Sequence, residues 1–92
     1  MTHAEQIMQA VASLVQEDKV VTFSRRQVRD QIGIDQDEWM KGYTAIFQAM
    51  RADHPGGAPP IGEKFRGVFQ RVSHGEYVLT YYGKELLKQF GQ

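Results

Sequence analysis

Residues 24–50 read SRRQVRDQIGIDQDEWMKGYTAIFQAM, and this stretch decides the fold. Ser24 and Gln27 have the spacing of a capping box, in which each side chain bonds the other residue's free backbone N–H. A short helix is therefore predicted over Arg25–Ile32. Gly33 follows it and suits a left-handed helix C-cap, because glycine carries no Cβ that would clash there.

A second helix is predicted immediately afterwards. Asp35 is a good N-cap and Glu38 stands three residues on. Apolar side chains then recur at spacings of three and four, which predicts one buried helical stripe made of Trp39, Tyr43, Ile46, Phe47 and Met50. Two helices separated by a few residues around a glycine are typical of a helix-turn-helix unit.

Upstream of this unit, the sequence predicts one helix and one short strand. Thr2 and Glu5 form another capping box, and apolar residues then follow a helical stripe that ends near Glu17. The next run, Val20–Phe23, is β-branched and aromatic, and is expected to be a small strand.

Downstream, prolines and glycines predict a loop over residues 53–62. A hairpin is expected over about 65–80, with strands at 65–72 and 77–80 and with Gly75 supplying a positive φ at the turn. Strand alternation would place Arg66 and Gln70 on one face and Arg71 on the other, unless a bulge intervenes. A last helix is expected from Tyr81 to Phe90, capped by Thr80 and facing inward with Leu86, Leu87 and Phe90.

The whole order is helix, strand, helix, helix, strand, strand, helix, within one domain spanning residues 1–92. With FQRVSHGEYVLT at 69–80 and YYGKELL at 81–87, the chain resembles the winged helix-turn-helix family over nearly its full length. The resemblance implies an α+β fold with a three-helix core, a small antiparallel sheet with a wing hairpin, and a C-terminal helix. It also implies binding of double-stranded DNA by a small transcriptional regulator or by a restriction- or defence-associated module.

The resemblance implies that the third helix enters the major groove and that the wing touches the backbone or minor groove. The base contacts expected from it are Lys41, Thr44, Gln48 and Arg51. Glutamine bonds adenine in a bidentate way, and threonine contacts a base edge or a thymine methyl. The alternative is that the charged and amide members of this set only solvate an outer helix face.

Phosphate contacts are expected from two groups of residues. Arginines open the second helix, and further basic residues lie around the wing: Arg25, Arg26, Arg29, Lys64, Arg66, Arg71 and His74. An external anion would account for basic residues in a helix's first turn, where the helix dipole disfavours them. The alternative for the arginines is an ion pair with Asp30 or a neighbouring acid.

The overall charge argues against a strongly basic surface, because 11 Lys and Arg balance 11 Asp and Glu. Asp35, Gln36, Asp37 and Glu38 open the predicted third helix, and the three acids would repel phosphate, although capping and dipole pairing explain them better. The chain has no cysteine, no signal-peptide pattern and no apolar run near the roughly eighteen residues of a membrane span. We therefore expect a soluble, cytoplasmic protein with no membrane partner.

Catalysis finds little support in the sequence. The histidines His3, His54 and His74 lie in separate segments without metal-ligand spacing. Asp37 and Glu38 are adjacent on a helix and point apart, so they do not form an acid/base pair. We expect no enzyme activity, no metal and no cofactor.

A second hypothesis keeps the winged helix but replaces DNA with protein. Zero net charge, the acidic helix start and a surplus of aromatic residues favour a protein-interaction module, including an inhibitor of a host complex. Tyr81 and Tyr82 cannot both point inward, so at least one is expected near the surface, where it would contact a second copy or another protein.

Overall fold

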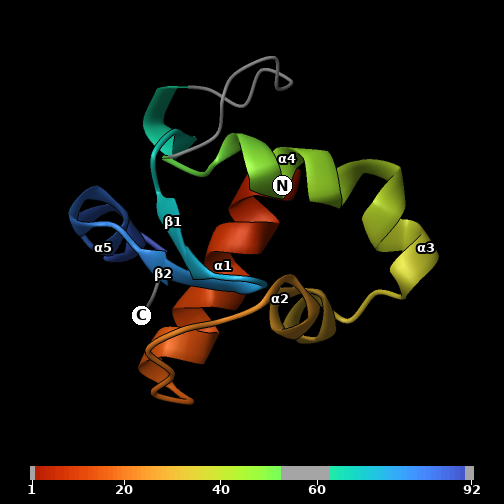
Figure 1. The fold of residues 1–92 in the computed structure, drawn as a ribbon, viewed down its shortest axis with the longest axis horizontal. Helices are drawn as coiled ribbons and strands as arrows, with labels where there is room; N and C mark the ends of the chain where they lie inside the picture. The colour runs from red at the N-terminus through yellow and green to blue at the C-terminus, as the bar shows by residue number, and fades with distance from the viewer. Residues whose placement is uncertain (1, 53–62, 91–92) are drawn as a thin grey trace.

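The computed structural model describes residues 2–52 and 63–90, which form helices and a two-stranded antiparallel sheet (Figure 1). The chain is thus an α+β protein, as predicted. The elements are α1 (His3–Gln16), α2 (Arg25–Ile32), α3 (Gln36–Glu38), the π-helical turn η1 (Trp39–Tyr43), α4 (Thr44–Ala49), the 3-10 turn η2 (Glu63–Phe65), β1 (Phe69–Ser73), β2 (Glu76–Leu79) and α5 (Tyr81–Leu87). The predicted loop at 53–62 lies outside the described residues.

Both predicted capping boxes are present. In α1 the Thr2 N–H donates to the Glu5 carboxylate at 2.8 Å, and the Glu5 N–H donates to the Thr2 hydroxyl at 3.2 Å. The bond from the Thr2 backbone lowers the pKa of the Glu5 carboxyl, because it favours the charged form. In α2 the same exchange joins Ser24 and Gln27, and Gly33 ends the helix with φ 91°. These ends are confirmed.

The predicted third helix is confirmed as α3, η1 and α4, which follow one another without a break. At η1 the Thr44 N–H bonds to the carbonyl of Trp39, five residues back, so one turn of the helix is widened. The predicted stripe faces the core: its members are buried except for the half-buried Ile46.

The predicted strand at 20–23 is wrong except at its last residue. Phe23 forms an isolated bridge with Tyr77. The preceding residues do not join the sheet, because Lys19 adopts φ 61° and the Val20 N–H bonds back to the Leu14 carbonyl of α1. The chain therefore bends, and Val21 is 83% exposed.

The hairpin is confirmed, with a later start than predicted. Residues 63–65 form η2 instead of strand, and Gly67, with φ 76°, turns the chain before β1 begins at Phe69. Arg66 therefore precedes the strand, so its predicted alternation with Gln70 is wrong. Gly75 has φ 76° at the tight turn, as predicted. The register pairs Phe69 with Leu79 and is irregular between Arg71 and Ser73.

An aromatic cluster joins the hairpin to the helices. The Phe47 ring of α4 lies 4.9 Å from Phe69 and 5.0 Å from Tyr77, and Phe23 lies 5.3 Å from Phe69. All four side chains are buried, and α1 supplies Ile7, Met8 and Val11 to the same core. The core therefore fixes the hairpin against both α1 and the third helix.

The last helix is shorter than predicted. The Thr80 hydroxyl accepts from the Gly83 N–H at 3.0 Å and donates to the Gly67 carbonyl at 2.6 Å, so it caps α5 and also ties it to the turn before β1. The helix ends at Leu87, and 3-10-type backbone bonds over 85–90 continue the turn to a half-buried Phe90. Leu86 and Leu87 are buried, as predicted.

Replacement of Gly83 by alanine should destabilise the fold. A Cβ at this position would lie 2.2 Å from the Val68 carbonyl oxygen, which is backbone and cannot rotate away. We expect Gly83→Ala to lower the free energy of unfolding in urea by about 1–3 kcal/mol or more, despite alanine's higher helix propensity. The exposed neighbour gives the control, since Lys84→Ala should change it by less than about 0.5 kcal/mol. Equal stability of the two variants would contradict this packing.

Candidate nucleic-acid interface

A hollow of about 700 Å³ lies between α2 and the first half of the third helix. It brings together residues of two predicted classes, the phosphate-contacting arginines and a base-contacting threonine. Its lining consists of Arg25, Arg26, Arg29, Gln36, Trp39, Met40 and Thr44. The lining therefore contains three positive charges and no acid, in a chain whose net charge is zero.

The capping box at Ser24 determines where the arginines point. It starts α2 at Arg25, so that Arg25 and Arg26 stand in the first turn, where both side chains are exposed. Neither forms a hydrogen bond or ion pair with any residue that the structure describes. Both guanidinium groups are thus available to an external anion.

Arg29 is held differently. Its side chain is only 19% exposed and lies 3.3 Å from the Asp30 carboxylate. It also donates to the side-chain oxygen of Gln36, at the start of the third helix. The predicted alternative, an ion pair with Asp30, is thus present for Arg29. The hydrogen bond to Gln36 ties α2 to the third helix across the hollow.

The third helix supplies the other wall. Trp39 is buried and stacks on Tyr43, with ring centroids 5.9 Å apart and planes 13° from parallel. Met40, by contrast, is 58% exposed, and Thr44 is half-buried. Met40 belongs to the π turn and Thr44 follows it directly, so the wall combines an apolar side chain and a hydroxyl beside the arginines.

The acids that open the third helix stay outside this lining. The Asp35 carboxylate accepts from the Glu38 N–H at 2.8 Å and caps the helix, as predicted. Asp37 and Glu38 are exposed, and neither lines the hollow. The structure thus shows the capping role of Asp35 directly.

The four predicted base contacts are not all alike. Thr44 lines the hollow and Lys41 is exposed on the same helix. Gln48 and Arg51 contact each other, with Arg51 donating to the Gln48 side-chain oxygen at 2.5 Å and lying 5.7 Å above the Tyr77 ring. These two residues therefore link the end of α4 to the hairpin.

The basic residues predicted for the wing form two pairs, one at each end of the hairpin. Arg71 and His74 lie near the turn of the hairpin, and the Phe23–Tyr77 bridge brings that end of the hairpin toward the start of α2 (Figure 1). Lys64 and Arg66 precede β1, at the other end. The Lys64 ammonium lies 5.2 Å from the Phe65 ring and 5.9 Å from that of Phe90. The structure thus separates the two pairs.

Three lining residues were not among the predicted contacts. Gln36 lies in the acidic start of the third helix and accepts a hydrogen bond from Arg29. Trp39 was predicted only as a core residue, and Met40 is apolar, whereas the predicted base contacts are all polar. An apolar residue next to a core tryptophan but off its stripe was the available signal for Met40.

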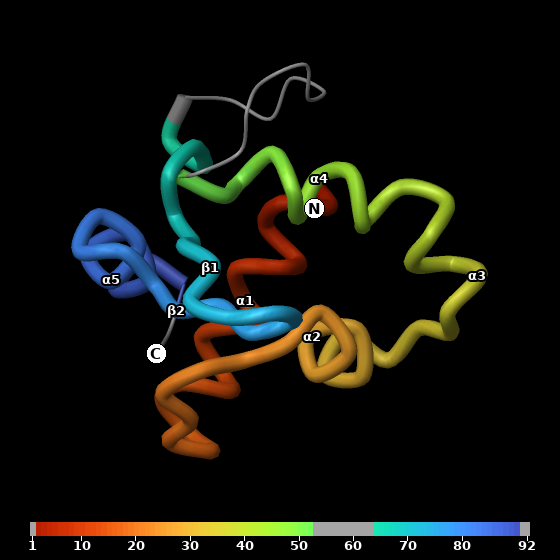
Figure 2. The backbone as a smooth tube through the Cα atoms, in the orientation of Figure 1, coloured from red at the N-terminus to blue at the C-terminus, as the bar shows by residue number. Residues whose placement is uncertain are grey.

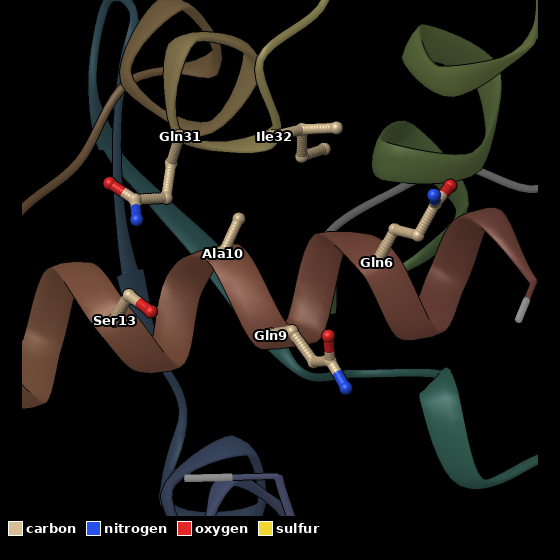
Figure 3. A pocket seen from close by; sticks show the side chains of 6 residues that line it. All are labelled: Gln6, Gln9, Ala10, Ser13, Gln31 and Ile32. Carbon is tan, nitrogen blue, oxygen red and sulfur yellow. The ribbon is translucent and has the colours of Figure 1, made fainter.

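A second hollow, of about 220 Å³, lies between α1 and α2 (Figure 3). Gln6, Gln9, Ala10 and Ser13 come from α1, and Gln31 and Ile32 face them from α2. Gln6 accepts a hydrogen bond of 2.7 Å from the Tyr43 hydroxyl. Because every lining residue is uncharged, this hollow has no cationic side chain to bind an anion, unlike the arginine hollow.

Within residues 2–52 and 63–90, no group of three or more histidine, aspartate or glutamate side chains is arranged to hold a metal ion. Over the same ranges, no helix has both the length and the apolar character to cross a membrane. Comparisons of the chain with protein-family models, with curated proteins and with solved structures found no match in any of the three. Its function therefore has to be inferred from its own residues and geometry.

The role of Asp35 as a cap can be separated from its charge. Asparagine caps a helix as well as aspartate does, whereas alanine does not. We expect Asp35→Ala to lower the free energy of unfolding by about 1 kcal/mol. Asp35→Asn should leave it within about 0.5 kcal/mol of the original. Urea denaturation measures both, and an equal loss in the two variants would show that the charge, not the cap, stabilises the helix.

Proposed function

We propose that this chain is a winged helix-turn-helix domain that binds double-stranded DNA through the arginine hollow and the adjoining end of the hairpin. The observation that carries the proposal is the exposure of Arg25 and Arg26, without internal partners, beside the polar wall of the third helix. Phosphate oxygens are the anions that guanidinium groups bind in a bidentate way.

The order of elements supports the winged-helix assignment. Three helical segments precede a hairpin, and the Phe23–Tyr77 bridge adds a minimal first strand on the outer edge of β2. In the family that the chain resembles, the third helix enters the major groove and the wing contacts the flanking backbone. The same placement here would set Arg25 and Arg26 against one phosphate strand, with Arg71 and His74 near its continuation.

Base contacts would come from the exposed side of the third helix. Thr44 offers a hydroxyl, and the Met40 side chain offers an apolar contact of the kind that suits a thymine methyl. Lys41 projects from the same helix. Gln48 and Arg51 are held by each other and contribute to the link between α4 and the hairpin instead.

Salt-dependent binding of a labelled random-sequence duplex tests the proposal. Fluorescence anisotropy at about 50 and about 200 mM salt should show affinity that falls steeply with salt, because bound cations are released from DNA. Arg25→Gln/Arg26→Gln should weaken binding and reduce the slope of log affinity against log salt by about 2. Both side chains are exposed, so the fold should be unaffected.

The matched control is Lys64→Gln/Arg66→Gln, which removes the same charge at the other end of β1. If the contact is at the hollow, this variant should bind much more like the original chain than the arginine variant does. Equal losses in the two double variants would instead indicate attraction by net charge alone. Absence of binding at about 50 mM salt would overturn DNA binding. It would favour the protein-interaction module, for which the exposed Asp37 and Glu38 are the observation to follow.

A further inference from the structure

A groove of about 610 Å³ lies on another part of the molecule, where the end of α1 and the bend after it meet β2 and α5. Its walls are mostly apolar. The lining residues are Val15, Gln16, Val20, Val21, Val78, Leu79, Lys84, Leu87 and Lys88. None of them lines the arginine hollow.

The backbone of β2 is open at this groove. Tyr77 exchanges both of its backbone hydrogen bonds with Phe23, each at 2.9 Å, so its N–H and C=O face away from β1. In an antiparallel pair this direction repeats at every second residue, so the N–H and C=O of Leu79 face the same way. Phe69 lies opposite Leu79 in the register, but its N–H donates to the Met50 carbonyl and its carbonyl accepts from the Ala52 N–H. Among the described residues, none bonds to the backbone of Leu79.

The segment that precedes Phe23 does not pair with this edge of β2. Continuing the strand beyond the Phe23–Tyr77 bridge would place Val21 opposite Leu79, but the chain bends away there. Figure 2 shows this segment looping below α1 before it rises toward α2. A β-branched, strand-forming segment is therefore exposed beside an unpaired strand edge, and its Val21 is 83% exposed.

Charged residues of both signs lie at the groove or near it in the chain. Lys84 lines it, is exposed and forms no ion pair with any described residue, whereas Lys88 is paired with Glu85 at 3.2 Å. Glu17 and Asp18 are exposed at the start of the bend, and they too have no ion-pair partner in the described part of the chain. Acids thus stand a few residues from Val21, and a free lysine stands on the rim of the groove.

We propose that this groove is the contact surface for a second copy of the chain. Val21 of each copy packs into the groove of the other, beside the unpaired backbone of Leu79. Glu17 and Asp18 of each copy face Lys84 of the other. A second copy fits because residues 17–21, which adjoin the groove, carry acids complementary to Lys84 and the exposed apolar side chain of Val21. A two-fold axis then makes every contact twice.

The test is the oligomeric state of the purified chain, measured by sedimentation velocity over a range of concentrations. We expect a concentration-dependent dimer, and Val21→Asp should raise its dissociation constant by at least about tenfold by burying a charge in the contact. Val72→Asp is the matched control, because Val72 is 50% exposed on β1 and does not line the groove. Circular dichroism of both variants checks that the fold is kept.

Charge exchange tests the same contact without touching Val21. Lys84→Glu should weaken the dimer, and adding Asp18→Lys in the same chain should restore it at least in part, since residues 18 and 84 then again carry opposite charges. A chain that stays monomeric up to about 1 mM would overturn the proposal, because a specific contact would be populated at that concentration. So would a dimer that Val21→Asp and Lys84→Glu leave unchanged, or one that Tyr81→Ala alone abolishes. None of these outcomes depends on DNA binding.

Discussion

The arrangement of the whole molecule depends on one short connection, the pair of backbone hydrogen bonds between Phe23 and Tyr77. It joins the segment between the first two helices to the hairpin, 54 residues further along the chain. Aromatic packing on both sides holds it: Phe23 meets the edge of Phe69, and Tyr77 meets the edge of Phe47. Edge-to-face pairs of buried rings add specific geometry to the hydrophobic gain. Without this connection neither the start of α2 nor the turn of the hairpin would have a fixed place relative to the other.

The arginine hollow follows from that constraint together with two local ones. The capping box at Ser24 begins α2 one residue after the bridge segment ends, which leaves Arg25 and Arg26 at the surface. The contact of Arg29 with Gln36 then holds the start of the third helix across from them. Placing like charges close together costs free energy unless solvent or an anion compensates. Two of the three arginines have no internal partner among the described residues, so their guanidinium groups are available to the external anion proposed above.

Local sequence signals predicted the helix starts well and the strand limits poorly, for a physical reason. A capping box depends on two side chains three residues apart, so Ser24 and Gln27 suffice to define where α2 begins. A strand needs a partner, and Val20–Val21–Thr22 has strand propensity but is turned away by the backbone of Lys19 and Val20. The start of β1 was likewise predicted too early: η2 and the turn at Gly67 precede it, and Phe65 of η2 packs 6.0 Å from Phe90, a residue distant in sequence that local propensity does not report. Of the site, the arginines and Thr44 were predicted from residue type and position, whereas Met40 is indicated only by its place beside Trp39 and off the apolar stripe.

The two proposed surfaces lie on either side of the Phe23–Tyr77 bridge along the chain. From the Phe23–Tyr77 bridge, the chain runs forward into the arginines of α2 and backward into Val21 and the groove. Along β2 the same bridge separates the turn of the hairpin from Val78 and Leu79. A segment paired fully along β2 would close the groove and leave a sheet without an open edge there. The bent segment instead leaves the backbone groups of Leu79 without a partner among the described residues and leaves Val21 exposed, which costs stability in an isolated copy. Occupation of that edge by a second copy offsets the cost, and the two lining sets share no residue, so the arginine hollow keeps its full complement of side chains.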